Sequence, residues 1–413
     1  MKINKHTLPN GLRLVHTYIK STQMVALNIL YNVGARDEIP GHTGFAHLFE
    51  HLMFGGSVHI PNYDEPLQLA GGENNAWTNN DITNYYLTIP KQNVEIGFWL
   101  ESDRMLGLDF SQKNLDVQRG VVMEEFKQNN LNRPYGDVDH LLRGLAYKVH
   151  PYRWSTIGEN LSHIANATLD EVKDFFFHYY APNNAILAVT GNITFEEAKM
   201  LTEKWFAPIP KREVRTKNIP SEPALFEQRR LVVERHVPLD SLYMAFPMSN
   251  RLSPDYYAYD ILSDILANGQ SSRLRQHLVN EKGIFSAIDA YILGSIDAGL
   301  LRINGKPSKG ISLEEAEQAV WEELSLIKQI PIDEHELEKV KNKFEAAHIF
   351  GNMNYLSIAT NLAWFELIGQ AEDLEKEVEK YRAVTSQHLM RVAIDTFKKE
   401  NSCVIHYKSV NHD

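Results

Sequence analysis

Two histidines and a glutamate near the N-terminus have a spacing that could hold a metal ion. His47 and His51 lie four residues apart, and Glu50 lies between them. The surrounding apolar residues recur at three- and four-residue steps, which predicts an amphipathic helix ended by Gly55 and Gly56. On such a helix the two imidazoles stack on one face and can share one small ion.

The order His-x-x-Glu-His (HxxEH) is the inverted zincin arrangement, in which two imidazoles bind zinc and the carboxylate acts as a general base. Glu50 lies about 60° around the helix from His47, close enough to reach a water on the ion. The alternative is that two half-buried histidines sit on an ordinary core helix. The five-residue pattern alone supports both interpretations.

A catalytic zinc site needs a third protein ligand, and Glu124 and Glu125 are the obvious candidates. They lie in residues 92–130, which are predicted to be helical. At about 100° per residue, Val121 and Val122 define a buried direction between them; Glu125 falls about 10° from it and Glu124 about 110° away. The pattern therefore predicts Glu125 as the ligand and Glu124 as a solvated surface acid.

Gln118 also falls about 10° from this direction, one heptad before Glu125. An amide or carboxylate aimed at an apolar face needs a partner, because burying an unpaired polar group is costly. Metal ligation would satisfy Glu125. Gln118 is predicted to form a hydrogen bond in the second shell of the site.

The composition limits the class of protein. A chain of 413 residues suggests two to three domains, and a net charge of −11 argues against nucleic acid and gives no reason to expect an anionic membrane. Apolar runs are too short for a membrane helix. The single cysteine, Cys403, excludes an internal disulfide and a thiolate metal site. Residues 1–6 have no signal-peptide character, which predicts a cytoplasmic protein, or a periplasmic one if a signal peptide has been removed.

The element pattern predicts an α+β fold in two halves. Strand-like segments occupy residues 1–40, where Val25 to Val33 alternate as in a half-buried strand. Thr168 and Thr194 begin predicted helices on either side of a buried strand at 185–189. The stretch between Ile209 and Phe226 is rich in proline and shows no hydrophobic periodicity, so it is predicted to be a linker. The predicted boundaries are a first domain at 1–212, a linker at 213–225 and a second domain at 226–413.

The second half repeats the first in its order of strand, loop, helix and glycine, so the two halves are interpreted as diverged copies of one unit. Only the first copy carries the His, Glu and His set. Two such halves facing each other would leave a cleft, which is a usual place for a site.

An Asn- and Thr-rich segment containing Asn75, Ala76 and Trp77 predicts strands joined by a turn near a sheet edge. It is either a solvated hairpin or an edge that accepts a peptide as an added strand. Composition alone favours the solvated hairpin.

Taken together, these motifs resemble the pitrilysin/insulinase family of zinc metallopeptidases (inverzincins), and most closely its small bacterial, processing-peptidase-like members. The resemblance covers essentially the whole chain. It is carried by residues 47–51 (HLFEH), 119–125 (RGVVMEE), 75–78 (NAWT), 150–152 (HPY), 180–185 (YAPNNA) and 269–274 (GQSSRL).

The resemblance implies two homologous α+β domains, each a mainly antiparallel sheet packed with helices, closing like a clamshell on a peptide. It implies one Zn²⁺ per chain, bound by His47, His51 and Glu125, with Glu50 as the general base that activates the water. It also implies that Asn75, Ala76 and Trp77 lie on an edge strand that pairs with substrate backbone, which reverses the interpretation from composition.

Two departures from the family pattern concern activity. A glutamate is common seven residues before the zinc glutamate, where this chain has Gln118. Many active members also carry an Arg and, seven residues later, a Tyr in the second half; the matching positions here are Val279 and Ser286. A one- or two-residue error in this alignment is the alternative, but no Arg/Tyr pair at that spacing occurs nearby.

Three functions follow from the resemblance. The leading one is a zinc endopeptidase for short or unfolded peptides, as the zinc-bearing subunit of a dimer. The partner would be a homologous chain that carries the Arg/Tyr pair, or otherwise a second copy. The alternatives are a non-catalytic structural core subunit and a processing peptidase that removes targeting sequences.

Overall fold

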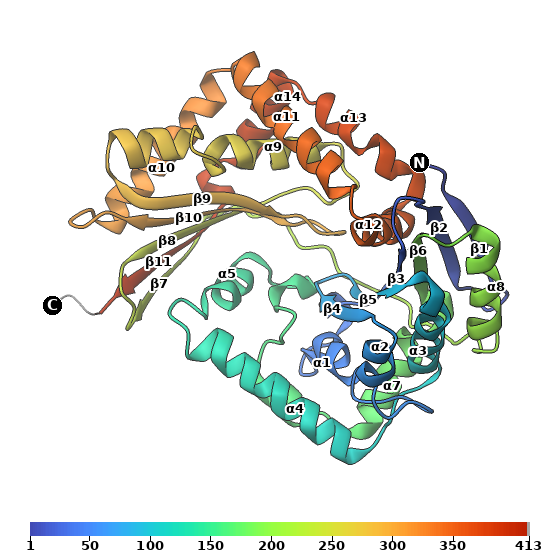
Figure 1. The fold of residues 1–413 in the computed structure, drawn as a ribbon. Helices are drawn as coiled ribbons and strands as arrows, with labels where there is room; N and C mark the ends of the chain where they lie inside the picture. The colour runs from blue at the N-terminus through green and yellow to red at the C-terminus, as the bar shows by residue number, and fades with distance from the viewer. Residues whose placement is uncertain (411–413) are drawn as a thin grey trace. The chain divides into compact units, whose positions relative to one another are not determined.

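The computed structural model describes residues 1–410 (Figure 1), which form two compact units. Unit 1 comprises Met1–Asn129, Trp154–Ile219 and Ile349–Lys376. Unit 2 comprises Asn130–Arg153, Pro220–His348 and the chain from Glu377 onward.

This division is not contiguous, unlike the predicted domains 1–212 and 226–413. The main change of unit falls between Ile219 and Pro220, inside the predicted linker at 213–225. Two further segments depart from the predicted boundaries: 130–153 packs with unit 2, and 349–376 packs with unit 1. Each supplies a helix that covers one face of a sheet, as described below.

Unit 1 contains a six-stranded sheet in the order β1-β2-β6-β3-β5-β4, in which only β2 and β6 pair in parallel. Its strands are β1 (Asn4–Thr7), β2 (Arg13–Tyr18), β3 (Met24–Tyr31), β4 (Glu73–Thr78), β5 (Thr83–Pro90) and β6 (Ala185–Gly191). The strand β3 is buried on both faces, so the prediction that it is half-buried was wrong.

Helices cover both faces of this sheet, which explains the burial of β3. One face packs on α1 (Phe45–Leu52), α3 (Val94–Leu106), α7 (Leu169–Tyr179) and α8 (Phe195–Phe206). The other face packs on α12 (Tyr355–Ile368), through Val15, Ala26 and Leu30 of the sheet and Ile358 and Leu362 of the helix.

The region 92–130, predicted as continuous helix, is divided. After α3, the chain turns at Gly107 and begins α4 (Gln112–Phe126), where Ser111 accepts a hydrogen bond from the Asn114 amide at 3.2 Å. A π-helical turn, Lys127–Leu131, follows. Unit 1 also contains α2 (Asp64–Leu69) and α6 (Leu161–Ala165).

Unit 2 contains a five-stranded sheet in the order β7-β11-β8-β10-β9. Its strands are β7 (Arg229–Arg235), β8 (Ser241–Pro247), β9 (Phe285–Leu293), β10 (Leu300–Pro307) and β11 (Cys403–Ser409). The helices α9 (Asp255–Ala267), α10 (Leu313–Gln329), α11 (Glu334–Gly351) and α14 (Ser386–Thr396) lie on one side of it in Figure 1, and α5 (Val138–Ala146) lies on the other. The short helix α13 (Glu377–Arg382) packs on α9.

The two sheets share one strand order, because β2-β6-β3-β5-β4 corresponds to β7-β11-β8-β10-β9. Each also has one parallel pair, β2 with β6 and β7 with β11. This correspondence confirms the predicted α+β fold built from two related units.

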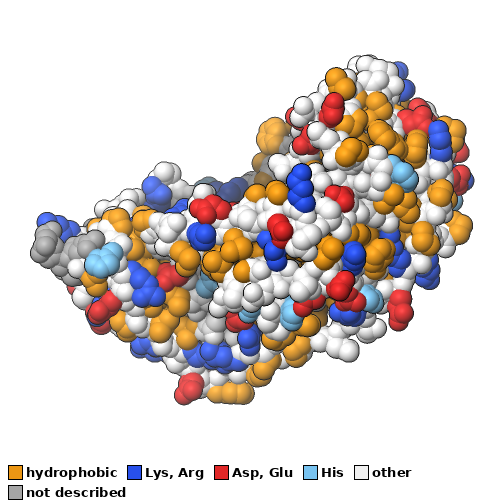
Figure 2. Space-filling model, turned by 90° about the horizontal axis from the view of Figure 1, so that it is seen from below, with side chains coloured by type: hydrophobic (Ala, Val, Ile, Leu, Met, Phe, Trp, Pro, Cys, Tyr) orange, Lys and Arg blue, Asp and Glu red, His pale blue; other side chains and the backbone are white. Residues whose placement is uncertain are grey.

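The surface mixes charge types. Figure 2 shows Lys and Arg side chains interspersed with Asp and Glu on the visible face. Among residues 1–410, no helix is both long enough and apolar enough to span a lipid bilayer.

Candidate metal centre

The helix α1 carries both histidines of the HxxEH motif on one side. Its opposite side is buried through Phe45, Leu48 and Phe49, which fixes the rotation of the helix about its axis. His47 and His51 are therefore directed away from the core and stay partly accessible, with ring centroids 4.9 Å apart. The four-residue spacing in the sequence thus places the two imidazole rings side by side.

The helix α4 brings a carboxylate to these imidazoles. Oε2 of Glu125 lies 3.6 Å from Nε2 of His47 and 3.5 Å from Nε2 of His51. One ligand atom from each residue lies within 4.8 Å of the others, and no other group of this kind occurs in residues 1–410. Ligand atoms of a tetrahedral zinc ion are about 3.3 Å apart, so this donor set fits zinc closely.

The electrostatic surroundings also suit a cation. Burial lowers the pKa of His47, which favours the neutral imidazole that can donate a lone pair to a metal. The hydrogen bond with His51 lowers the pKa of Glu125 and favours its ionised form. Nδ1 of His47 is buried without a hydrogen-bond partner in the described chain, which leaves Nε2 as the nitrogen facing the site.

The two neighbouring carboxylates of α4 lie in different surroundings. Glu125 is half-buried beside the histidines, whereas Glu124 is exposed and pairs with Lys127 at 3.4 Å. One premise of the prediction was wrong, because Val121 is 47% exposed; the buried side of α4 is formed by Leu115, Val122 and Phe126. Measured from Val122 alone, Glu125 lies about 60° around the helix and Glu124 about 160°, so Glu125 is still the carboxylate nearer the buried side.

Gln118, which was predicted to form a hydrogen bond to a metal ligand, is half-buried on α4, two turns before Glu125. In residues 1–410 its amide makes no hydrogen bond to a predicted ligand, so its role stays a prediction. Asn129 instead reaches the second carboxylate oxygen of Glu125 at 3.5 Å. Asn129 was not predicted from the sequence, although it lies four residues after Glu125, where α4 continues into the π-helical turn.

The carboxylate of Glu50 accepts a hydrogen bond from a residue for which no role was predicted. The hydroxyl of Thr78, the last residue of β4, donates a hydrogen bond to Oε2 of Glu50 at 2.6 Å. Thr78 directly follows Trp77 in the predicted substrate-binding segment, and this proximity in the sequence was the available signal.

The predicted substrate-binding residues Asn75, Ala76 and Trp77 lie on β4, which is an edge strand of the first sheet. The strand also contacts α1, which carries the histidines. Asn75 is exposed, and its side-chain oxygen accepts a hydrogen bond from the Ala76 amide at 2.8 Å. The pairing of substrate with this edge stays a prediction.

Two hydrogen-bonding groups fix the helix α1. Its N-cap, Gly44, has φ +90° and no side chain to satisfy the first backbone N–H groups. The buried carboxylate of Glu38 accepts hydrogen bonds from the Gly44 and Ala46 amides at 2.8 and 2.9 Å. The hydroxyl of Tyr85 on β5 donates to the Phe49 carbonyl at 3.0 Å. Burial raises the pKa of Glu38 well above its usual range.

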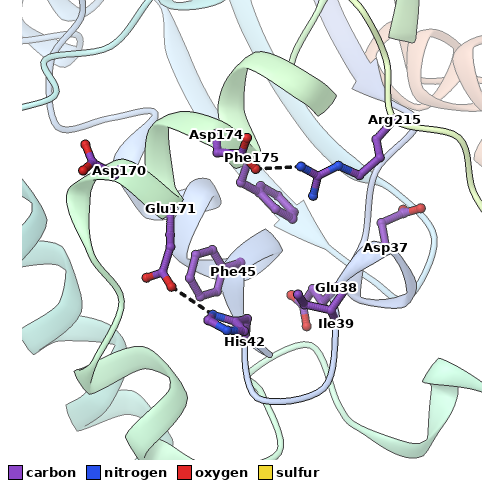
Figure 3. A pocket seen from close by; sticks show the side chains of 10 residues that line it. All are labelled: Asp37, Glu38, Ile39, His42, Phe45, Asp170, Glu171, Asp174, Phe175 and Arg215. Atoms are coloured by element: carbon purple, nitrogen blue, oxygen red, sulfur yellow. Dashed lines mark hydrogen bonds and ion pairs between the residues drawn. The ribbon is translucent and has the colours of Figure 1, made fainter.

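A separate pocket of about 390 Å³ lies beside the N-terminus of α1 (Figure 3). Phe45 and Phe175 form apolar parts of its lining, and two ion pairs flank it: His42 with Glu171 at 3.3 Å and Arg215 with Asp174 at 2.8 Å. None of the described residues lining it is a predicted ligand or catalytic group.

The positions predicted to correspond to the family's Arg and Tyr lie in unit 2. Val279 is half-buried in the π-helical segment Arg275–Glu281 and packs on the core of that unit. Ser286 is exposed near the start of β9 and donates a hydrogen bond to the Lys306 carbonyl at 3.1 Å. Neither side chain has the charge of an arginine or the phenol group of a tyrosine, and the correspondence stays a prediction.

With this geometry in place, comparison with known protein families gives two adjacent matches. Residues 13–159 match the insulinase model of peptidase family M16, and residues 166–344 match the model described as the peptidase M16 inactive domain. Together these matches cover most of the chain, including the motif helix. The chain belongs to peptidase family M16, the insulinase family, as its motifs predicted.

Individual relatives extend over nearly the full length. The chain is 28% identical to the zinc protease PqqE of Helicobacter pylori, over 97% of this chain and 92% of that protein. It is 24% identical to the uncharacterized zinc protease YmxG of Bacillus subtilis, with 96% of each covered. The crystal structure of a protease from Helicobacter pylori superposes with a TM-score of 0.91 at 28% identity, over 98% of this chain and 99% of that one.

Proposed function

We propose that this chain is the zinc-bearing subunit of a metalloendopeptidase that hydrolyses short or unfolded peptides. The observation that carries the proposal is the group formed by His47, His51 and Glu125, with Glu50 on the same helix as the histidines. A structural subunit would have no need of this group. The naming of full-length relatives as zinc proteases supports the same conclusion.

Different residues of the site bind the metal ion and transfer the proton. When bound, zinc supplies a Lewis acid that polarises the scissile carbonyl and lowers the pKa of water. His47, His51 and Glu125 hold the ion. Glu50 takes a proton from the attacking water and delivers it to the leaving amine, as a general base and then a general acid. The edge strand β4 pairs with peptide backbone, which makes sequence preference loose.

The test is hydrolysis of a peptide library by the zinc-loaded protein, followed by mass spectrometry. Glu50→Gln is expected to keep one zinc per chain and to lose hydrolysis, because the amide cannot accept the proton. Glu124→Gln is the matched control, since it makes the same change on an exposed carboxylate, and it should retain activity. Turnover by Glu50→Gln at the wild-type rate would refute the assignment of the base.

The replacement of Arg and Tyr by Val279 and Ser286 favours a heterodimer within this proposal. Groups that stabilise a developing oxyanion typically contribute about a hundredfold or more in rate. A homologous chain without the zinc motif would supply them, so the chain alone would be weakly active. A homodimer that works without the pair is the competing arrangement.

The partner is tested by assaying the chain alone and then mixed with a zinc-less relative from the same source. The mixture is expected to be far more active, and Val279→Arg with Ser286→Tyr should raise the activity of the chain alone. Full activity of the unmixed wild-type chain, unchanged by the relative, would exclude the heterodimer.

A further inference from the structure

The hydrogen bond between Thr78 and Glu50 joins the strand predicted to bind substrate to the helix predicted to carry the general base. Thr78 ends β4, the edge strand, and Glu50 lies on α1 between the two histidines. The hydroxyl donates a hydrogen bond to Oε2 at 2.6 Å. It engages one carboxylate oxygen and leaves Oε1 to accept a proton.

The backbone of Thr78 is fixed by the turn that follows it. The Asn79 side-chain oxygen accepts hydrogen bonds from the Asp81 and Ile82 amides at 2.8 and 2.9 Å. The Asn79 amide donates to the Ile82 carbonyl at 3.0 Å, and Thr78 pairs with Thr83 across the hairpin. The Thr78 hydroxyl therefore lies next to a hydrogen-bonded turn, and the end of β4 that carries it is not free to move.

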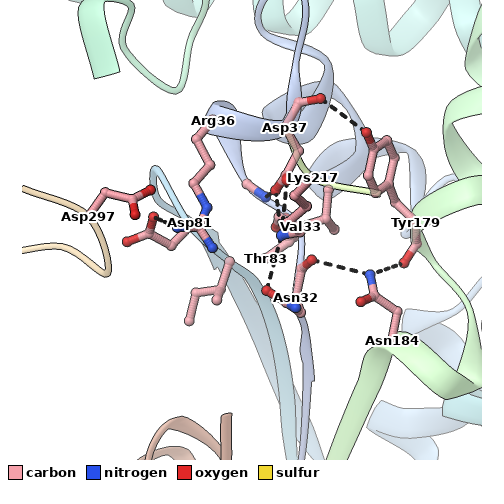
Figure 4. Close-up of polar contacts among 12 residues, drawn as sticks. Asn32, Val33, Arg36, Asp37, Asp81, Thr83, Tyr179, Asn184, Lys217 and Asp297 are labelled. Atoms are coloured by element: carbon pink, nitrogen blue, oxygen red, sulfur yellow. Dashed lines mark hydrogen bonds and ion pairs between the residues drawn. The ribbon is translucent and has the colours of Figure 1, made fainter. Parts of the chain in front are cut away.

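Residues 34–36 bind this turn, in part through the ion pair of Arg36 with Asp81 that Figure 4 draws. The Ala35 amide donates to the Asn79 carbonyl at 3.1 Å, and the Arg36 amide donates to the Asn80 carbonyl at 2.8 Å. The guanidinium of Arg36 also pairs with Asp81 at 3.2 Å. The approach at Gly34 is so close that an added Cβ would lie 2.6 Å from the Asn80 backbone.

The same segment leads directly to the cap of α1. Asp37 is held by Lys217 at 2.9 Å, and the next residue, Glu38, binds the first amides of the helix. Residues 34–38 thus form hydrogen bonds both to the hairpin that carries Thr78 and to the helix that carries Glu50. The position of the Thr78 hydroxyl relative to Glu50 is set by these hydrogen bonds.

We propose that Thr78 is a positioning residue through which the edge strand β4 sets the orientation of Glu50. Because its turn is already fixed, Thr78 holds the carboxylate that must accept the proton in one position relative to the strand edge with which a peptide backbone pairs. Substrate pairing and placement of the base then depend on the same element, β4. This inference rests on the proposed peptidase function and adds the residue that connects its two parts.

The kinetic test compares Thr78→Val, which keeps the shape without the donor, with Thr78→Ser, which keeps the donor. Because general-base catalysis contributes about 10²–10⁴-fold, a misplaced base should lower kcat at least tenfold in Thr78→Val. Zinc content should stay at one per chain and KM within about twofold of wild type. Thr78→Ser should restore most of kcat.

Thr88→Val is the matched control at the far end of the same hairpin, where the Thr88 hydroxyl bonds Glu73 at 3.2 Å and not α1. It should leave kcat unchanged. An unchanged kcat in Thr78→Val, a rise in KM alone, or an equal loss of kcat in Thr88→Val would overturn the proposal.

A second measurement does not depend on activity. The melting temperatures of Thr78→Val, Glu50→Ala and the double variant form a cycle, and a direct link predicts that the two losses are not additive. Additive losses would overturn the link between Thr78 and Glu50. An inactive wild-type chain, alone and with its relative, would instead overturn the proposed function.

Discussion

At the scale of residues, Glu124 and Glu125 show how adjacent carboxylates acquire different chemistry. Only Glu125 reaches the histidines, whereas Glu124 faces solvent beside Lys127. An exposed ion pair contributes little, but a third zinc ligand decides whether the ion is held.

Glu125→Ala is therefore expected to lower zinc affinity by more than about a hundredfold, because even an outer-shell residue can account for that much. His51→Ala should behave in the same way. Metal content after dialysis against a weak chelator, measured by mass spectrometry, is the readout. Glu124→Ala is the control and should keep one zinc; the reverse result would mean that the other carboxylate is the ligand.

The sequence predicted the residues of this site that are linked by helical spacing. The i, i+4 spacing placed His47 beside His51, and the angle along α4 separated Glu125 from Glu124. It could not predict Thr78 as the partner of Glu50, because that bond joins residues 28 apart on different elements. Contacts of this kind depend on how a hairpin packs on a helix, which periodicity does not encode.

At the scale of elements, α1 has eight residues and depends on Glu38 for its start. Glu38→Ala would leave the Gly44 and Ala46 amides buried without acceptors, at a cost of about 1–3 kcal/mol each. We expect a melting temperature lower by roughly 3–15 °C and weaker zinc binding, because both histidines lie on this helix.

Thermal unfolding followed by circular dichroism, with and without zinc, would measure both effects. Glu38→Gln keeps one acceptor and should lie between Glu38→Ala and wild type. Glu65→Ala, on an exposed position of α2, is the control and should be neutral. A wild-type melting temperature in Glu38→Ala would show that the cap is dispensable.

The helix α5 is fixed to the second sheet by Asp139. Its carboxylate pairs with Arg143 at 2.6 Å and with Arg302 of β10 at 2.8 Å. Burial alone would raise the pKa of Asp139, but the two arginines overcome this effect and lower it to about 2. The ordinary value of an unfolded aspartate is about 3.9.

Because the pKa is lower in the folded state, Asp139 stabilises the fold above about pH 5 and loses this contribution as the pH falls toward 2. Asp139→Asn should be less stable than wild type at pH 7 and should approach it near pH 2. Its side chain is 40% exposed, so the difference should be about 1 kcal/mol or less. Urea unfolding across this pH range is the measurement, and a difference that grows on acidification would contradict it.

Hydrophobic periodicity and helix-capping residues predicted most helices and strands. Thr168 and Thr194 each accept the hydrogen bond expected of an N-cap. The degree of burial of β3 was not predictable in this way, because it depends on α12, more than three hundred residues later in the chain. Amphipathic helices reveal that they have a partner but not which sheet it is.

At the scale of the whole molecule, the two halves of the sequence each give a helix to the other half's sheet. The segment with α5 belongs to unit 2, and the segment with α12 belongs to unit 1. The main change of unit lies inside the segment 213–225, which composition predicted as a linker. Composition could not reveal the exchange: α12 is more apolar than its neighbours α11 and α13, but an apolar helix does not show which sheet it covers.

The exchange predicts that residues 1–212 alone will not form a stable unit. Without α12, Val15, Ala26 and Leu30 would expose an apolar sheet face, so this fragment should aggregate and bind a hydrophobic dye. Fusion of residues 349–376 to its C-terminus should improve solubility, and the same fusion with Leu362→Asp is the control that should not. Size-exclusion chromatography would decide; a monomeric, folded 1–212 would disprove the dependence on α12.

The late position of α12 also has a consequence for synthesis on the ribosome. The last strand of the first sheet, β6, ends at Gly191, and α12 ends at Ile368. At about 5–20 residues per second, roughly 9–35 s separate the completion of the sheet from that of its covering helix. During this interval the nascent chain presents an uncovered apolar face, so we expect its productive yield to rise with the supply of chaperones that bind it before translation ends.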